Sequence, residues 1–346
     1  MSEPVRLQGG RTRRGMRSPP GRAAGRRKGS RGAGAWKWLG LGLVGLVVLG
    51  GVWLGLTAGG TTGPTKVAAH RRVTAVQQIP VRSRYGIAPA PASEQVHVAF
   101  KAPPRGGLLF DVNTGEVMWQ HDPQRVLPIA SLTKMMTALV VVGHSRPADR
   151  VLITPQAVHF TGSGVGLLPL HKRVAELALL YGLILPSGND AAIALAQHVG
   201  GTQAGFIAMM NARARQLGLS CTHFTTESGI IDQGNHSCVA DLALMAHEVL
   251  DQPLLARIVD SRSAIVPFPI KGGKLYLYNN NPLLIVGYPG ADGVKGGFTT
   301  ASGPCLVATA RRGRTWLGVV LLHSVNSLSQ SERLLNSGFT VMRKAA

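Results

Sequence analysis

Cysteine is scarce in this chain of 346 residues, which contains only Cys221, Cys238 and Cys305. They form no C-x-x-C pair and show no spacing typical of metal ligands, which argues against a cysteine-ligated metal centre. In an oxidising compartment a Cys221–Cys238 bridge is possible. We favour the alternative that all three are small, buried apolar residues.

Acidic residues are also few: 16 Asp and Glu stand against 37 Lys and Arg, which gives a formal net charge of +21. Residues 1–34 hold ten Lys or Arg, and Glu3 is the one acidic residue among them. Such a tail taken alone would suggest nucleic-acid binding. The segment that follows argues against that interpretation, and we expect no nucleic-acid partner.

Residues 39–58 form a run of twenty residues without a charge, preceded by two tryptophans and a lysine. At about 1.5 Å per residue, a helix of this length spans a hydrocarbon core of about 30 Å. Basic residues favour the cytoplasmic side, and Trp favours the membrane interface. The sequence therefore predicts a disordered cytoplasmic tail (1–35), one transmembrane helix (36–58) and an extracytoplasmic remainder. The alternative is a cleaved signal peptide, whose apolar stretch is usually about 7–15 residues long.

Residues 59–97 are rich in Gly and Pro and lack a lasting periodicity, so they are expected to be an extracytoplasmic linker. The folded domain is predicted over residues 98–346, and it contains no internal repeat. Helices are predicted at 130–142, 173–185, from 190, 203–216 (with Gly218 as its C-cap), 239–250 and 328–343. Strands are predicted at 107–112, 116–120, 264–270, 274–278, 293–298, 305–311 and 315–323. This order indicates an α/β (α+β) fold, in which helices cover one antiparallel sheet and the first and last segments lie side by side.

Ser131 and Lys134 form an S-x-x-K motif at the start of a helix that is apolar all around. Residues three apart on a helix share one face, so the amine and the hydroxyl lie within contact distance. Burial disfavours an ammonium and lowers the pKa of a lysine. A neutral lysine beside a hydroxyl is a general base beside a nucleophile, which acyl transfer requires.

Two further short motifs follow in order, and each alone is weak evidence. Ser187 and Asn189 form an S-x-N motif on a loop after Pro186, where a serine can relay a proton and an amide can orient a substrate. Ser and Asn are also good helix N-caps, which is the plainer interpretation. Lys295 begins the third motif, Lys-Gly-Gly, whose glycines let another backbone approach closely. A turn with an exposed lysine is the alternative there.

Taken together, these segments resemble the low-molecular-mass penicillin-binding proteins that act as serine D-alanyl-D-alanine carboxypeptidases. PIASLTKMMTALVVV resembles their nucleophile helix, and LLYGLILPSGNDAAIALA looks like their second motif with its flanking helices. MNARARQLGLSCTHFTTESGI is similar to the segment that follows, and DGVKGGFTTASGPCLVATARRGRTWLGVVLL is similar to the third-motif strand and hairpin. The resemblance covers the predicted domain and implies a serine β-lactamase/DD-peptidase-like fold with a helical subdomain.

The resemblance implies a role for each motif residue. Ser131 would attack the D-Ala-D-Ala carbonyl with Lys134 as base, Ser187 would assist proton transfer, and Asn189 would bind the substrate. Lys295, Gly296, Gly297 and Phe298 would line the substrate site, Lys295 facing the terminal carboxylate. The backbone N–H groups of Ser131 and Phe298 would form the oxyanion hole.

The implied partners are the peptidoglycan stem peptide, β-lactam antibiotics as inhibitors that acylate Ser131, and the lipid bilayer through the amino-terminal helix. The reaction needs no metal and no organic cofactor. The expected location is the cell membrane, with the catalytic domain on the cell-wall side.

The sequence departs from the family pattern at Gly296, where these proteins usually have Thr or Ser. Thr299 and Thr300 are nearby hydroxyls that could replace it. A β-lactamase of the same fold would need an E-x-x-L-N segment, whereas Glu227 is followed by Ser-Gly-Ile. Three alternatives stay open: a DD-endopeptidase, a weakly active or inactive penicillin-binding scaffold, and a sensor.

Overall fold

The computed structural model describes residues 86–166, 168–230 and 234–345. The predicted basic tail, the predicted transmembrane helix (36–58) and most of the predicted linker (59–97) lie outside the described residues. Within the described part of the chain, no helix is both long and apolar enough to cross a membrane.

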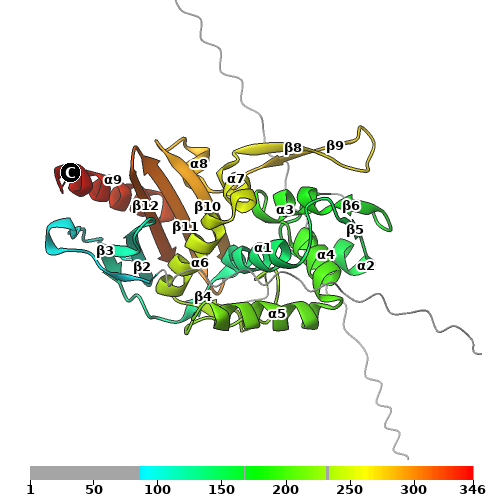
Figure 1. The fold of residues 1–346 in the computed structure, drawn as a ribbon, viewed down its shortest axis with the longest axis horizontal. Coiled ribbons are helices and arrows are strands. Elements are labelled where there is room, and N and C mark those ends of the chain that lie inside the picture. Colours follow the sequence, from blue (N-terminus) through cyan, green and yellow to red (C-terminus); the bar gives the residue numbers. More distant parts are fainter. Residues whose placement is uncertain (1–85, 167, 231–233, 346) are drawn as a thin grey trace, which may run out of the picture. The chain divides into compact units, whose positions relative to one another are not determined.

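A six-stranded sheet forms the centre of the described fold (Figure 1). In spatial order its strands are β1 (Ala88–Pro89), β3 (Glu116–His121), β2 (Gly106–Asp111), β12 (Thr315–Leu322), β11 (Gly303–Arg312) and β10 (Ala291–Thr299). The first hairpin pairs with the last strand through β2 and β12, as the sequence predicts. The pairs are antiparallel apart from β1 and β3, which run parallel. Strand β10 lies at one edge of this sheet.

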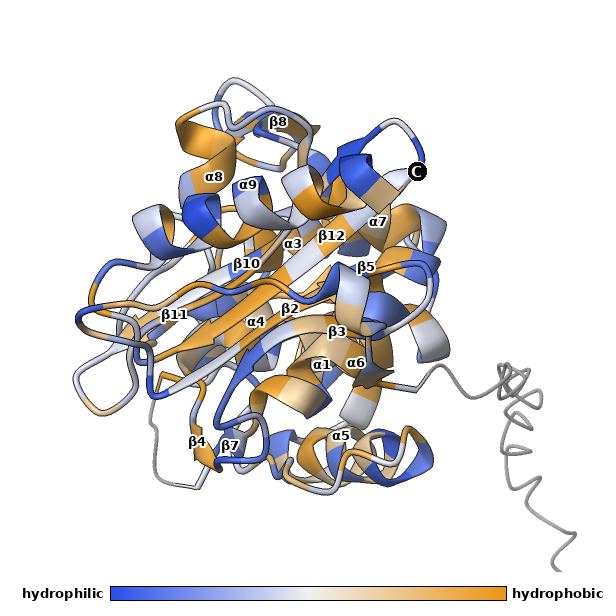
Figure 2. Ribbon diagram, turned by 90° about the vertical axis from the view of Figure 1, so that its left-hand side faces the viewer, coloured by the Kyte–Doolittle hydropathy of each residue, from blue (hydrophilic) through white to orange (hydrophobic). Residues whose placement is uncertain are grey.

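Helices cover both faces of the sheet, because successive side chains along a strand point to opposite faces. Leu109 packs in a core beneath α9 (Ser327–Ala345), while Leu108 and Phe110 pack in a second core with α1 (Thr133–His144) and α6 (Val239–Asp251). Figure 2 shows apolar colour along β11 and β12 and hydrophilic residues on α9. The second core joins the sheet to α1, the helix that directly follows the predicted nucleophile Ser131.

The other helices continue from this second core. They are α2 (Pro155–Val158), α3 (Glu176–Ile184), α4 (Asn189–Gly200), α5 (Gln203–Gln216) and α7 (Pro253–Asp260). Helix α5 has the predicted bounds, because the Thr202 hydroxyl accepts a hydrogen bond from the Gly205 N–H at its start and Gly218 adopts a φ of 71° after its end. Helix α3 begins three residues later than predicted, since Arg173–Ala175 forms strand β6, paired with β5 (Arg150–Leu152).

Two predicted strands do not join the main sheet. β8 (Ser263–Pro267) and β9 (Lys274–Tyr278) form a separate two-stranded sheet, so the expectation of one sheet is wrong here. Leu275 and Leu277 are buried, whereas Tyr276 and Tyr278 are exposed, which shows that one face of the hairpin packs on the core. The chain passes through α8 (Pro282–Ile285) before β10, and this separates the hairpin from the edge of the main sheet.

The ordered fold begins before residue 98, inside the predicted linker. β1 pairs with β3, a 3-10 helix η1 (Ala92–Glu94) follows, and Ala90 and Val96 are buried beneath α9. In this Ala/Pro-rich segment the contacts with the domain are made by single residues of an extended chain. No repeating pattern of apolar residues therefore arises in the sequence. Among the described residues, regular structure thus begins ten residues before the predicted start at residue 98.

A disulfide bond joins Cys221 and Cys238, so our preference for three free cysteines is wrong. Cys305 takes no part in the bridge, and its buried thiol lies 3.7 Å from the Gly303 carbonyl oxygen. The bridge ties the segment after α5 to the start of α6. The sequence left this pairing open because both the bridged and the free form suit buried cysteines.

Replacing both Cys221 and Cys238 by serine should lower the free energy of unfolding by about 3 kcal/mol, because the bridge closes a short loop in the unfolded chain. For a domain of this size that corresponds to a fall in Tm of about 6–12 °C. Thermal unfolding with and without dithiothreitol measures the effect. Reductant should lower the Tm of the wild type and leave the double variant unchanged; an unchanged wild type would contradict the prediction.

Candidate active site

Ser131 and Lys134 meet where the sheet joins the helices. Ser131 lies in a 3-10 turn, η2 (Ala130–Leu132), that leads directly into α1. Ser131 is partly exposed, whereas Lys134 is completely buried. The Lys134 Nζ lies 3.0 Å from the Ser131 Oγ, as the helical spacing predicts.

The Lys134 amine has two further partners, and neither of them can donate a proton. Its Nζ donates to the side-chain carbonyl of Asn189 at 2.7 Å and to the backbone carbonyl of Ser228 at 2.7 Å. A neutral amine has two hydrogens and one lone pair. The two carbonyl oxygens take both hydrogens, which directs the lone pair towards Ser131 Oγ, the one partner that carries a proton to give.

Burial is the main cause that lowers the pKa of Lys134 well below its ordinary value, and the nearby ammonium of Lys295 lowers it further. Glu227 and Asp190 act in the opposite direction. A buried ammonium is disfavoured when its hydration is lost. The site therefore favours the neutral amine, the form that can accept a proton.

The carbonyl of Ser228 was not among the residues predicted from the sequence. It is held near Lys134 because the chain at Gly229 passes tightly against Ala130 and Thr133. Gly229 adopts a φ of 73°, and a Cβ there would collide with the Ala130 carbonyl oxygen. Glycine alone fits this position without strain. In the sequence, Gly229 permits a close backbone approach, but it does not show which segment approaches it.

The Ser187–Asn189 loop joins α3 to α4 and brings the second motif to the amine. The Asn189 side chain makes two hydrogen bonds. Its carbonyl oxygen accepts from Lys134 Nζ, and its amide nitrogen donates to the Thr161 carbonyl at 2.6 Å. Ser187 adopts a φ of 66° and is 4% exposed. Within the described chain its buried hydroxyl has no hydrogen-bond partner. A buried hydroxyl of this kind is costly unless a ligand or water satisfies it.

Strand β10 lies against η2 and carries the third motif. A Cβ at Gly297 would lie 2.8 Å from the Ser131 backbone nitrogen, so the two backbones approach as closely as glycine permits. At Gly296 the nearest atoms to such a Cβ are 4.0 Å away. Phe298 is 66% exposed at the edge. The structure thus brings all the predicted site segments together; the predicted oxyanion hole stays a prediction.

Lys295 is almost fully buried, and its Nζ donates to the Gly296 carbonyl at 2.8 Å. Burial lowers the pKa of Lys295 to about 7. Thr299 is the last residue of β10, and its hydroxyl hydrogen-bonds to the hydroxyl and N–H of Ser302. Thr299 is therefore already engaged and is a poor replacement for the hydroxyl missing at Gly296.

A comparison with known protein families now identifies the group. Residues 96–326 match the peptidase family described as D-alanyl-D-alanine carboxypeptidase. The chain belongs to this family. The resemblance drawn from the sequence is thereby confirmed.

Curated relatives and solved structures agree with this membership. The chain is 32% identical to D-alanyl-D-alanine carboxypeptidase DacF of Bacillus subtilis, covering 64% of this chain and 56% of that protein. It is 33% identical to DacC of Escherichia coli, covering 72% of this chain and 64% of that protein. The alignments thus span less than two thirds of these relatives. A Streptomyces DD-transpeptidase structure matches with a TM-score of 0.66 at 30% identity, covering 70% of this chain and 100% of that one.

Replacing Gly297 by alanine should slow acylation of Ser131 by a fluorescent penicillin about 100-fold, because the new Cβ would push β10 away from Ser131. Gly296→Ala is the matched control on the same strand, where a Cβ has room, and it should change the rate little. Stopped-flow labelling measures both rates, and circular dichroism checks the fold. Equal rates for the two variants would show that close approach at Gly297 is unimportant.

Proposed function

We propose that this protein is a serine D-alanyl-D-alanine carboxypeptidase that removes the terminal D-alanine from peptidoglycan stem pentapeptides. The observation that carries the proposal is the geometry of Lys134. Its buried amine bonds two acceptors that cannot donate and faces the Ser131 hydroxyl at 3.0 Å. That arrangement prepares the serine for nucleophilic attack.

In the acylation step, the Ser131 Oγ attacks the carbonyl carbon of the penultimate D-alanine while its proton passes to Lys134 Nζ. The C–N bond to the terminal D-alanine then breaks, and the leaving nitrogen receives a proton through the Ser187 hydroxyl. Water then attacks the ester, releases the shortened peptide and returns the proton to Ser131. The backbone N–H groups of Ser131 and Phe298 would stabilise the oxyanion in both steps.

The substrate's terminal carboxylate fits the positive charge of Lys295, and the unsatisfied hydroxyl of Ser187 suits a polar substrate group. Asn189 would hydrogen-bond the substrate through its side chain. β-Lactams, which mimic the dipeptide, would acylate Ser131 in the same way.

We also propose that residues 36–58 anchor the protein in the cell membrane and that the catalytic domain works on the cell-wall side. The twenty uncharged residues from 39 to 58 and the basic tail before them support this orientation. The Cys221–Cys238 disulfide supports it as well, because disulfides persist mainly in oxidising compartments.

The full-length protein in detergent should release D-alanine from a pentapeptide, and Ser131→Ala should abolish both this release and covalent labelling by a fluorescent penicillin. Enzyme-coupled detection of free D-alanine, with gel fluorescence for the label, measures the two outcomes. Labelling without release would favour a binding scaffold or sensor. Cleavage of cross-linked dimers in preference to the pentapeptide would favour an endopeptidase.

The pH dependence of kcat/KM should be bell-shaped. On the acidic side, protonation removes the free amine of Lys134. On the alkaline side, activity should fall as the pH rises through about 7, because Lys295, whose pKa burial lowers to about 7, loses the positive charge that attracts the carboxylate.

Lys295→Arg tests the alkaline limb, because a guanidinium stays charged throughout the measurable range. The variant should keep kcat/KM at high pH relative to its own maximum. Profiles of D-alanine release between about pH 5 and 10 compare the two proteins. An alkaline limb at the same pH in both would mean that another group causes it.

A further inference from the structure

Three potential metal ligands outside the catalytic cluster converge at the far end of the α3–α4 pair. Glu176 is the first residue of α3, His198 lies in the last turn of α4, and Asp149 immediately precedes β5. One ligand atom from each lies within 4.8 Å of the other two. His198 Nε2 and Glu176 Oε2 are 3.9 Å apart. Imidazole nitrogen and carboxylate oxygen are ligands that Zn²⁺ takes in proteins.

Glu176 supplies an independent reason to expect a cation. Its side chain is fully buried, and within the described residues neither carboxylate oxygen has a hydrogen-bond partner. The nearby Ser145 hydroxyl donates its proton to the Val141 carbonyl at 2.8 Å. A buried carboxylate without a donor is costly, and a bound cation would satisfy it.

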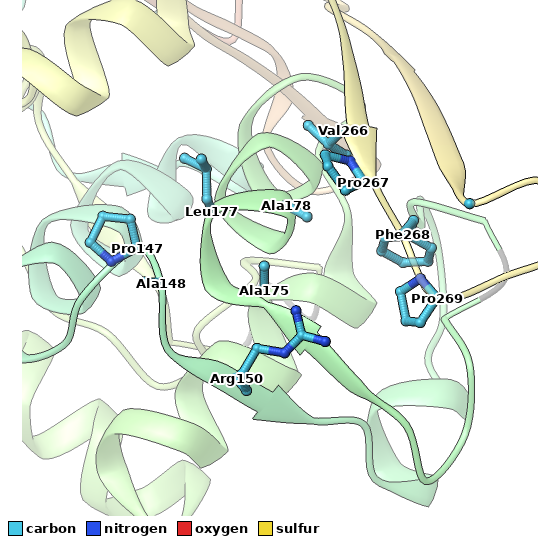
Figure 3. Close-up of a pocket in the computed structure, with 11 residues that line it drawn as sticks. Pro147, Ala148, Arg150, Ala175, Leu177, Ala178, Val266, Pro267, Phe268 and Pro269 are labelled. Carbon is cyan, nitrogen blue, oxygen red and sulfur yellow. The ribbon is translucent and has the colours of Figure 1, made fainter.

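The surrounding residues show how an ion would reach the cluster. The residues on either side of Asp149 and of Glu176 line an apolar pocket of about 570 Å³ beside the β8–β9 hairpin (Figure 3), but these two acids are not part of its wall. His198 lines a different hollow, and its side chain is 27% exposed. The His198 imidazole and the Asp149 carboxylate are thus both partly open to solvent, and the Glu176 carboxylate lies buried behind them.

We propose that Asp149, Glu176 and His198 bind one divalent transition-metal ion of the Zn²⁺ class, with water completing the coordination. Tetrahedral Zn²⁺ with bonds of about 2.0–2.1 Å places its ligand atoms about 3.4 Å apart, so a small side-chain movement closes the present 3.9 Å separation. Arg146 pairs with Asp149 at 3.4 Å, but its side chain is 86% exposed. Such surface pairs contribute little, so the arginine can be displaced.

The proposed ion would be structural rather than catalytic. It would join the start of α3 to the end of α4, and the loop at the opposite end of this helix pair carries Ser187 and Asn189. The ion would therefore stabilise the packing of α3 against α4, the two helices that position the second motif. A metal that binds the folded state alone stabilises that state by mass action.

The test uses full-length protein in detergent, stripped with EDTA and then titrated with ZnCl₂. Calorimetry should give one tight site per chain, and a hundredfold excess over Kd should raise the Tm by about 5–10 °C. His198→Gln and Glu176→Gln should each remove the site and the Tm shift. Because His198 is partly exposed, its variant is expected to fold even if Glu176→Gln does not.

His223→Gln is the matched control, since it removes an imidazole that stacks on His236 and takes no part in the proposed site. This variant should keep both the stoichiometry and the Tm shift. The absence of a tight site in the wild type would overturn the proposal. It would also be overturned if His198→Gln kept the site or if His223→Gln lost it.

Discussion

The burial of one amine organises the catalytic centre. Lys134 belongs to α1, and its Nζ contacts Ser131 in η2, Asn189 at the start of α4 and the Ser228 carbonyl in the segment after α5. Removing an amine from water is costly unless its hydrogens are satisfied. Because these partners come from separate parts of the chain, the amine acquires its lowered pKa only when the whole domain has folded. Folding and chemical competence are thus coupled through this one group.

Close backbone contacts complete the site. Gly229 lets the Ser228 segment pass against the residue before Ser131, and Gly297 lets β10 lie against the Ser131 backbone. Neither position has room for a Cβ, so both require glycine. The turn η2, which contains Ser131, therefore lies in close contact with two other chain segments. Ser187 belongs to the second motif. Its backbone adopts a strained positive φ, and its buried hydroxyl has no hydrogen-bond partner in the described chain. Strain and unsatisfied polarity of this kind concentrate at functional sites.

Features that depend on local spacing could be predicted from the sequence. The contact between Ser131 and Lys134 follows from three-residue helical spacing, and the bounds of α5 follow from its capping residues. The contact of the Ser228 carbonyl could not be predicted, since every residue type has a backbone carbonyl. The contact also joins residues that are 94 positions apart in the sequence. The disulfide and the parallel β1–β3 pair depend on long-range packing in the same way. Periodicity reports burial within one element and does not say which element covers it.

Gly296 changes how the substrate carboxylate would be recognised. A hydroxyl at this position would hold the carboxylate through a directional hydrogen bond that does not change with pH. Its absence leaves Lys295 as the charged group of this motif, and the neighbouring Thr299 hydroxyl is already bonded to Ser302. A point charge attracts a carboxylate without fixing its orientation, and the pKa of this buried ammonium lies near 7. The space beside Gly296 admits a side chain, so its small size is not imposed by packing. Under the proposed function, recognition of the carboxylate would therefore rest more on the protonation state of Lys295 than on hydrogen-bond geometry.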